Sequence, residues 1–377
     1  MMTTPRHNFA SNLVLAQTDA DLQQQLTIHF GTSDLSAPNK SPLVTTTTDV
    51  MNWVVQKARS MYKAEPEKLV AAISSSATKN ALAVWSGSGR DWIVFSEGLM
   101  ELLRDRVDSV AERFEEAFPD LMNTTLMQRL LTRSPLPGGF TTSFSSFLYF
   151  AAVAFFTGHE AGHHLAGHKS QYPRQAHAEN SESGAIDVDG AWLIGQALER
   201  DADLLGITLC RIAVSSLLGQ LWEVDEAENL SADERKCFQR VLAALISTGA
   251  LTAAVFIKPK SIDWTNQPNV LHPPAVARLL TLAASISLAI KKNFHDLDGF
   301  YRRWIRLMSL EVAVGATITP GTNADRIHQE RIARGGELAA IRATGIRKAL
   351  HDPMFRKYMA QLDATIKEIR PGLKPRM

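Results

Sequence analysis

Cysteine is scarce in this chain, because its 377 residues include only Cys210 and Cys237. Two thiols cannot form a disulfide scaffold, a cysteine-rich zinc ribbon or an iron–sulfur cluster held entirely by cysteine. Any metal site must therefore use histidine and carboxylate ligands. The few cysteines, and a polar N-terminus without the pattern of a secretory signal, predict a cytoplasmic protein.

The chain also lacks an excess of charge of either sign. Lys and Arg number 40, Asp and Glu number 39, and the formal net charge is +1. A dedicated nucleic-acid binder normally carries a clear basic excess, so we expect no nucleic-acid partner. Residues 321–377 are mildly basic, and we interpret these charges as the solvated faces of surface helices.

Long hydrophobic runs are missing as well. The longest uncharged apolar stretch, residues 241–257, is at the lower limit of length for a membrane span. It contains Ser247, Thr248 and Thr252, which favours a buried core helix over a membrane helix. We therefore expect no membrane partner, although this stretch is borderline.

Apolar spacing predicts a mainly helical α+β protein with one small sheet. Two short β-prone runs, 80–85 and 91–96, are separated by a glycine-containing turn and predict a hairpin. Helical spacing is present in 97–118, 143–168, 190–222, 233–257 and 275–291.

Composition divides the chain into three expected parts. Residues 1–48 are predicted to be a polar segment and linker, and 292–377 a mildly basic helical extension. The central part, 49–291, is predicted to be the functional domain and to begin with a helix capped by Asp49. Within it, the polar stretch 169–189 is predicted to be a loop.

Histidine is concentrated in one place. Four of the 11 histidines fall within residues 159–168, and His159, Glu160 and His163 form an HExxH pattern. Residues four apart lie on the same face of a helix, so both imidazoles can bind one zinc ion. Glu160 projects to the side, where it can reach a zinc-bound water.

A third ligand must come from elsewhere in the chain. His164 and His168 have the wrong helical phase to share the metal, and we expect them to be structural or surface residues. Glu199 and Asp203 share a face of an apolar helix, where buried carboxylates are costly unless they are paired or metal-bound. We expect Glu199 to bind the metal and Asp203 to accept the second N–H of a ligand histidine. The alternative is an acidic surface patch at a helix end.

These blocks resemble the gluzincin metallopeptidases of the HtpX and CAAX-prenyl-protease type. The sequences HEAGHHLAGH and ERDADLLG are similar to that family's HExxH helix and its following ExxxD helix. Upstream, NALAVW followed by DWIVFSEGLMELL resembles a β segment whose edge strand would bind the substrate backbone by β-augmentation. Downstream, HPPAVARLL resembles the family's His-Pro motif, in which His272 would lie near the active site and Arg278 would support it. The alternative for this last block is an ordinary helix start.

The resemblance implies a zincin-like metallopeptidase with one Zn²⁺ per chain that hydrolyses a protein or peptide substrate. The expected zinc ligands are His159, His163 and Glu199. Glu160 would act as general base, and His272 would donate to the oxyanion. Members of the HtpX type carry clear transmembrane helices, whereas this chain has none that is unambiguous, so we expect a soluble outlier. The alternatives are a non-catalytic zinc-containing regulatory or interaction module, and a membrane-anchored protease of the same family. The sequence does not indicate an oligomeric state.

Overall fold

The computed structural model describes most of the N-terminal two thirds of the chain and a C-terminal helix. The described residues are 7–63, 65–117, 119–132, 143–171, 176–178, 191–221, 231–256, 278, 281–282, 285–286 and 353–373. The chain divides into two compact units, Met1–Glu182 with Ala202–Ala250 and Gly372–Met377, and Ser183–Asp201 with Leu251–Pro371. The division into three parts that the sequence suggested stays a prediction.

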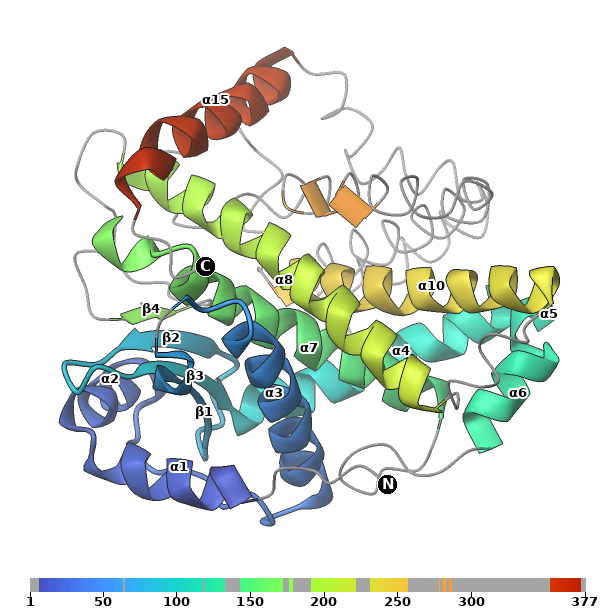
Figure 1. The fold of residues 1–377 in the computed structure, drawn as a ribbon, viewed down its shortest axis with the longest axis horizontal. Coiled ribbons are helices and arrows are strands. Elements are labelled where there is room, and N and C mark those ends of the chain that lie inside the picture. The colour runs from blue at the N-terminus through green and yellow to red at the C-terminus, as the bar shows by residue number, and fades with distance from the viewer. Residues whose placement is uncertain are drawn as a thin grey trace, which may run out of the picture. The chain divides into compact units, whose positions relative to one another are not determined.

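A small mixed sheet lies in the first unit (Figure 1). It contains β1 (Leu69–Ser74), β2 (Ala81–Trp85), β3 (Asp91–Ser96) and the short β4 (Ala176–Ala178), in the order β1-β3-β2-β4. The predicted hairpin is confirmed, because β2 and β3 pair antiparallel. Strand β1 pairs parallel with β3, and β4 pairs antiparallel with β2.

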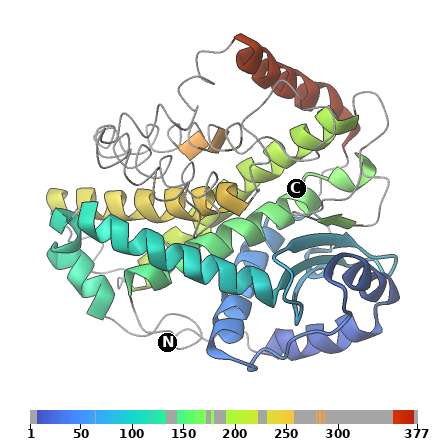
Figure 2. The same cartoon turned by 180° about the vertical axis from the view of Figure 1, so that it is seen from behind.

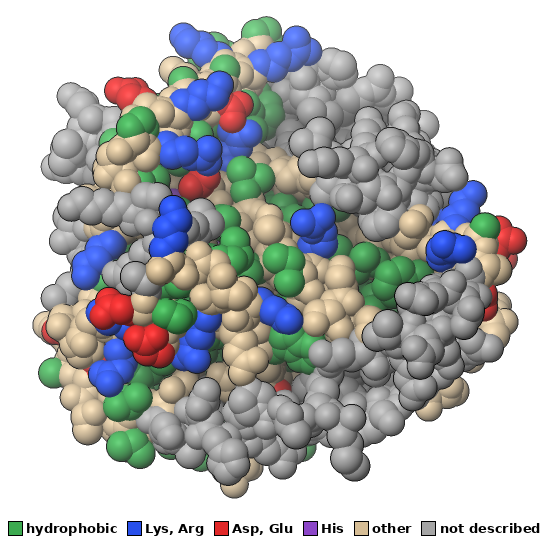
Figure 3. Space-filling view, in the orientation of Figure 1, with side chains coloured by type: hydrophobic (Ala, Val, Ile, Leu, Met, Phe, Trp, Pro, Cys, Tyr) green, Lys and Arg blue, Asp and Glu red, His purple; other side chains and the backbone are tan. Residues whose placement is uncertain are grey.

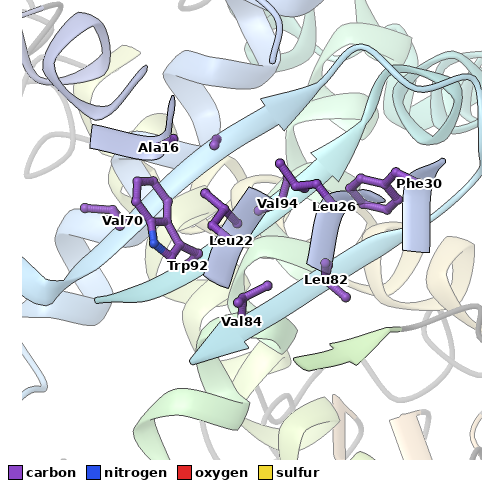
Figure 4. Close-up of a cluster of buried hydrophobic side chains, with 10 residues drawn as sticks. Ala16, Leu22, Leu26, Phe30, Val70, Leu82, Val84, Trp92 and Val94 are labelled. Atoms are coloured by element: carbon purple, nitrogen blue, oxygen red, sulfur yellow. The ribbon is translucent and has the colours of Figure 1, made fainter. Parts of the chain in front are cut away.

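Two N-terminal helices cover one face of this sheet. They are α1 (His7–Thr18) and α2 (Ala20–Phe30). Leu22, Leu26 and Phe30 of α2 are buried against alternate residues of the strands, among them Trp92 and Val94 (Figure 4). Although the segment is polar in composition, these apolar residues of α2 form part of the core.

Asp19 joins the same two helices to the hairpin. It caps α2 by accepting a hydrogen bond from the Leu22 N–H, at 3.2 Å. Its carboxylate also accepts hydrogen bonds from Ser86, Ser88 and the Trp92 indole, at 2.7 to 2.9 Å. These hydrogen bonds replace those to water that the carboxylate loses when it is buried.

The other face of the sheet is covered by longer helices (Figure 2). They are α3 (Pro42–Arg59), α4 (Glu97–Ala117) and α7 (Phe144–Leu165). Helix α3 begins at Pro42 with Ser41 as its N-cap, not at Asp49 as predicted. The run of threonines looked like a linker, yet the Thr47 hydroxyl bonds the Leu43 carbonyl and lies 2.6 Å from the Tyr149 hydroxyl.

The remaining elements extend the helical content. They are η1 (Pro66–Lys68), α5 (Pro119–Met122), α6 (Thr125–Thr132), η3 (His168–Gln171), α8 (Ala191–Leu221), α10 (Ala232–Phe256), α15 (Pro353–Ile369) and η6 (Arg370–Gly372). Helices α4, α7, α8 and α10 match their predicted ranges to within a few residues. The prediction of a mainly helical α+β fold with a small sheet is confirmed.

Among the described residues, one helix is long and apolar enough to cross a membrane. It is Trp192–Gly219 within α8, and 56% of its most apolar window is buried inside the structure. The core helix of a soluble protein passes the same test. The sequence marked the stretch 241–257 as borderline for a membrane span, and most of it lies in α10. The described residues of α10 are not long and apolar enough to cross a membrane.

Candidate metal centre

The candidate centre is built on α7, the most deeply buried helix of the first unit. Its N-cap Ser143 accepts a hydrogen bond from the Ser146 N–H at 3.1 Å. Its side chains are buried on every side, as expected for a helix that is apolar all round. His159, Glu160 and His163 nevertheless lie in it with 0% exposure. Polar groups buried in this way are costly unless they have partners, which indicates a specific role.

Glycines allow α7 and α8 to approach closely. A Cβ atom added to Gly162 would lie 3.1 Å from the Ala202 carbonyl oxygen, and one added to Gly206 would lie 3.1 Å from the His159 nitrogen. Gly158 faces α8 in the same way. Small residues four apart on a helix permit such backbone contact, so the GHEAG sequence of α7 carries both the ligand pattern and the packing surface. The ligand pattern by itself did not indicate this second role of the glycines.

Two histidines and one glutamate converge at this contact. His159, His163 and Glu199 are all buried, and each offers a ligand atom within 4.8 Å of the others. The two imidazole Nε2 atoms are 3.3 Å apart. Tetrahedral ligands about 2.0–2.1 Å from a zinc ion are separated by roughly 3.3–3.4 Å, so this spacing fits a shared ion. The residues therefore form a possible metal site.

Asp203 lies one helical turn after Glu199 on α8. Its Oδ1 atom is 2.9 Å from Nδ1 of His159, and both side chains are buried. A neutral imidazole that donates from Nδ1 presents its Nε2 lone pair to a metal. The structure thus brings Asp203 into the contact that the sequence suggested for it.

His168 makes a corresponding contact with the other histidine of the pair. Its Nδ1 atom is 2.9 Å from Nδ1 of His163, and its side chain is fully buried. If His163 presents Nε2 to a metal, its Nδ1–H donates to His168. Helical phase alone did not suggest this, because α7 ends before His168. Gly167, with φ of 74°, turns the chain so that His168 comes back beside His163.

The sequence predicted that His164 is a structural or a surface residue, and its contacts show that it is structural. Its Nε2 atom is 3.0 Å from the Trp92 carbonyl oxygen, and its ring packs edge-on against Trp85 at 5.3 Å. Its Nδ1 atom lies 3.7 Å from Asp91. His164 thus attaches the ligand-bearing helix to both strands of the hairpin.

Three other sequence expectations have different outcomes. His272 lies outside the described residues. Arg278 is helical and only 1% exposed, and a guanidinium buried so deeply requires acceptors; its support of His272 stays a prediction. The expectation that an edge strand of this β segment binds substrate stays a prediction; at Leu82–Val84 the edge of β2 is occupied by β4, which pairs with these residues.

Fold and site together define an α+β protein with a candidate histidine and glutamate metal centre. No protein-family model, no curated protein and no solved structure matches the chain.

Proposed function

We propose that this chain is a zinc-dependent endopeptidase of the gluzincin type. The observation that supports the proposal is the buried group of His159, His163 and Glu199, with Glu160 on the same turn of α7 as the two histidines. Asp203 adds the carboxylate that commonly orients a metal-binding imidazole. The likeness of these blocks to the HtpX and CAAX-prenyl-protease type supports the same assignment, and the proposed substrate is a protein or peptide.

Each of these residues has a defined task in the proposed reaction. His159, His163 and Glu199 would hold the ion and leave one coordination position open. A bound zinc ion supplies Lewis acidity, which activates water and polarises a carbonyl. Glu160 would accept the proton of the attacking water and return it to the leaving amine. The buried surroundings of α7 strengthen these charge interactions, because they exclude bulk water.

Glu160 separates an enzyme from a protein that uses zinc only for its structure. A structural zinc site normally has four protein ligands and no need of a neighbouring general base. Here the described residues supply three ligands, with Glu160 beside them. This favours catalysis over the alternative of a non-catalytic zinc-containing module.

The experiment is a comparison of two variants with the wild type. Purified full-length protein should contain one zinc ion per chain by elemental analysis and should cleave members of a peptide library. Glu160→Gln should keep its zinc and lose cleavage, whereas Glu199→Ala should bind zinc so much more weakly that it is purified without the ion, although two ligands and a measurable residual affinity remain. Glu101→Gln makes the same chemical change at an exposed position of α4 and serves as control. Equal cleavage by Glu160→Gln and wild type would refute the peptidase assignment.

A further inference from the structure

The C-terminal helix α15 lies against the N-terminal part of α8, which carries Glu199 (Figures 1 and 2). Polar contacts join this end of the chain to α8. Phe355, Tyr358 and Leu362 form the buried side of α15. The polar contacts are Tyr358 to Gln196 (2.5 Å), Asp363 to Arg200 (2.5 Å) and Arg370 to Asp201 (2.6 Å).

These polar contacts surround the third ligand in the sequence. Gln196 lies about one turn before Glu199, and Arg200 and Asp201 follow it directly. The backbone of a helix is hydrogen-bonded along its length, so restraint of these neighbours also restrains Glu199. Each of the three contacts therefore acts on the turn that must deliver a carboxylate to His159 and His163.

This part of α8 has reason to need support. The first turn of α8 contains no acidic residue that would interact favourably with the helix dipole. Helix ends open more readily than helix centres, and Glu199 lies in the third turn. A ligand near such an end is held well only when another element packs on the helix.

The contacts differ in strength. The hydroxyl of Tyr358 donates to the buried Gln196 side chain, and both residues are buried. Asp363 and Arg370 are more than half exposed, at 53% and 62% of their side chains. Exposed ion pairs are screened by water and contribute little, so the tyrosine contact should dominate.

We propose that α15 is a positioning element for the metal centre, with Tyr358 as its principal positioning residue. It holds the turn around Glu199 in place, so docking of the C-terminal helix and binding of the metal favour each other. This inference rests on the proposed zinc site. Because coupling of two binding events is reciprocal, loss of α15 contacts weakens metal binding, and metal binding in turn protects α15.

The test measures zinc affinity by competition with a chelator, in the full chain. Tyr358→Phe removes one hydroxyl and should weaken zinc binding about five- to tenfold, the loss expected for one buried hydrogen bond. Tyr62→Phe removes the hydroxyl of a different buried tyrosine, which contacts Asp91 at 3.4 Å, and should leave affinity unchanged.

The two exposed ion pairs supply a second comparison. Arg370→Gln should weaken zinc binding by less than about threefold, because its pair with Asp201 is largely screened. Lys367→Gln, three residues earlier in α15, makes a similar loss of charge and is its control. Basic side chains of α15 lie on the surface at the top of Figure 3, and Lys367 is exposed without contributing to these contacts.

A double-mutant cycle separates positioning from general stability. In the Glu199→Ala background the residual zinc affinity should no longer depend on Tyr358→Phe, because α15 then has no ligand to position. Zinc should also slow proteolysis within residues 353–369 in the wild type and not in Glu199→Ala. A persistent effect of Tyr358→Phe in the Glu199→Ala background would overturn the inference, since it would show general destabilisation.

The outcomes also separate this inference from the proposed function. If the wild type binds no zinc, both fall. If the wild type binds zinc and Tyr358→Phe binds it equally well, only the positioning role of α15 is refuted. A loss of affinity in Tyr358→Phe that disappears in the Glu199→Ala background supports the inference even if no peptide is cleaved.

Discussion

Replacement of Gly206 by alanine tests whether close contact between α7 and α8 assembles the metal centre. The added Cβ would lie 3.1 Å from the His159 nitrogen and 3.2 Å from the Phe155 carbonyl oxygen. Both neighbours belong to the backbone of α7, so neither can rotate away. Ordinary van der Waals contact begins at 3.4 Å, and the helices must therefore separate by about 0.3 Å, the difference from 3.1 Å.

Two opposing effects set the size of the change in stability. Alanine in place of glycine in a helix interior stabilises it by about 1 kcal/mol. Overpacking of a tight contact costs about 1–3 kcal/mol. The net expectation for Gly206→Ala is a loss of roughly 0–2 kcal/mol. A functional site tolerates errors of about 0.5 Å, so a separation of this size should weaken zinc binding several-fold without abolishing it.

Gly219 provides a matched control on the same helix. It is exposed, and an added Cβ would meet nothing within 4 Å. Gly219→Ala should therefore gain up to about 1 kcal/mol from helix propensity and keep its zinc affinity. Thermal unfolding and chelator competition on both variants and the wild type measure the two effects. If Gly206→Ala were stabilised as much as Gly219→Ala, with unchanged zinc affinity, close helix contact would not be what assembles the site.

The following predictions concern other residues. Asp203→Asn removes the carboxylate beside His159 and should lower zinc affinity about 10- to 100-fold, measured by chelator competition. Burial raises the pKa of Asp19, but hydrogen bonds, first among them that of Ser86, lower it by more, so the folded-state pKa is below its ordinary value of 3.8. Asp19 therefore contributes stability above pH 3.8 that is lost as the pH falls through the folded-state pKa. Denaturant unfolding should show Asp19→Asn less stable than wild type at pH 6, and the difference should shrink below pH 3.8. Burial raises the pKa of the Cys210 thiol, so iodoacetamide at pH 8 should label this residue only after unfolding, as read by mass spectrometry.

The parts of the fold that the sequence predicted are those with strong local patterns. The β2–β3 hairpin and helices α4, α7, α8 and α10 depend on runs of residues that favour one conformation. The sequence patterns did not predict β1, which is buried at every position and so does not alternate, or α2, which has few apolar residues. The stability of both comes from burial against partners distant in the sequence. Leu22 and Trp92, for example, meet across the sheet face although 70 positions separate them.

The same distinction explains the site. The spacing of His159 and His163, and of Glu199 and Asp203, follows from one turn of a helix and is visible in the sequence. What brings the two pairs together is a contact between helices, and its signal was the glycines rather than the ligands. His168 reaches His163 only because the chain reverses at Gly167.

The strand β4 shows why a pattern of residues cannot define how a substrate is bound. The sequence suggested that an edge strand of the β segment binds substrate, and residues Ala81–Trp85 do form a strand that packs against α7. A short segment that follows α7 and η3 pairs antiparallel with Leu82–Val84 and satisfies the backbone groups that a peptide would otherwise use. On this side of the sheet an extended peptide can therefore add only beyond β4 or in its place, and the strand at the opposite edge is β1. A free edge is a property of all strands in a sheet together, so it can be assigned only when every neighbour is placed.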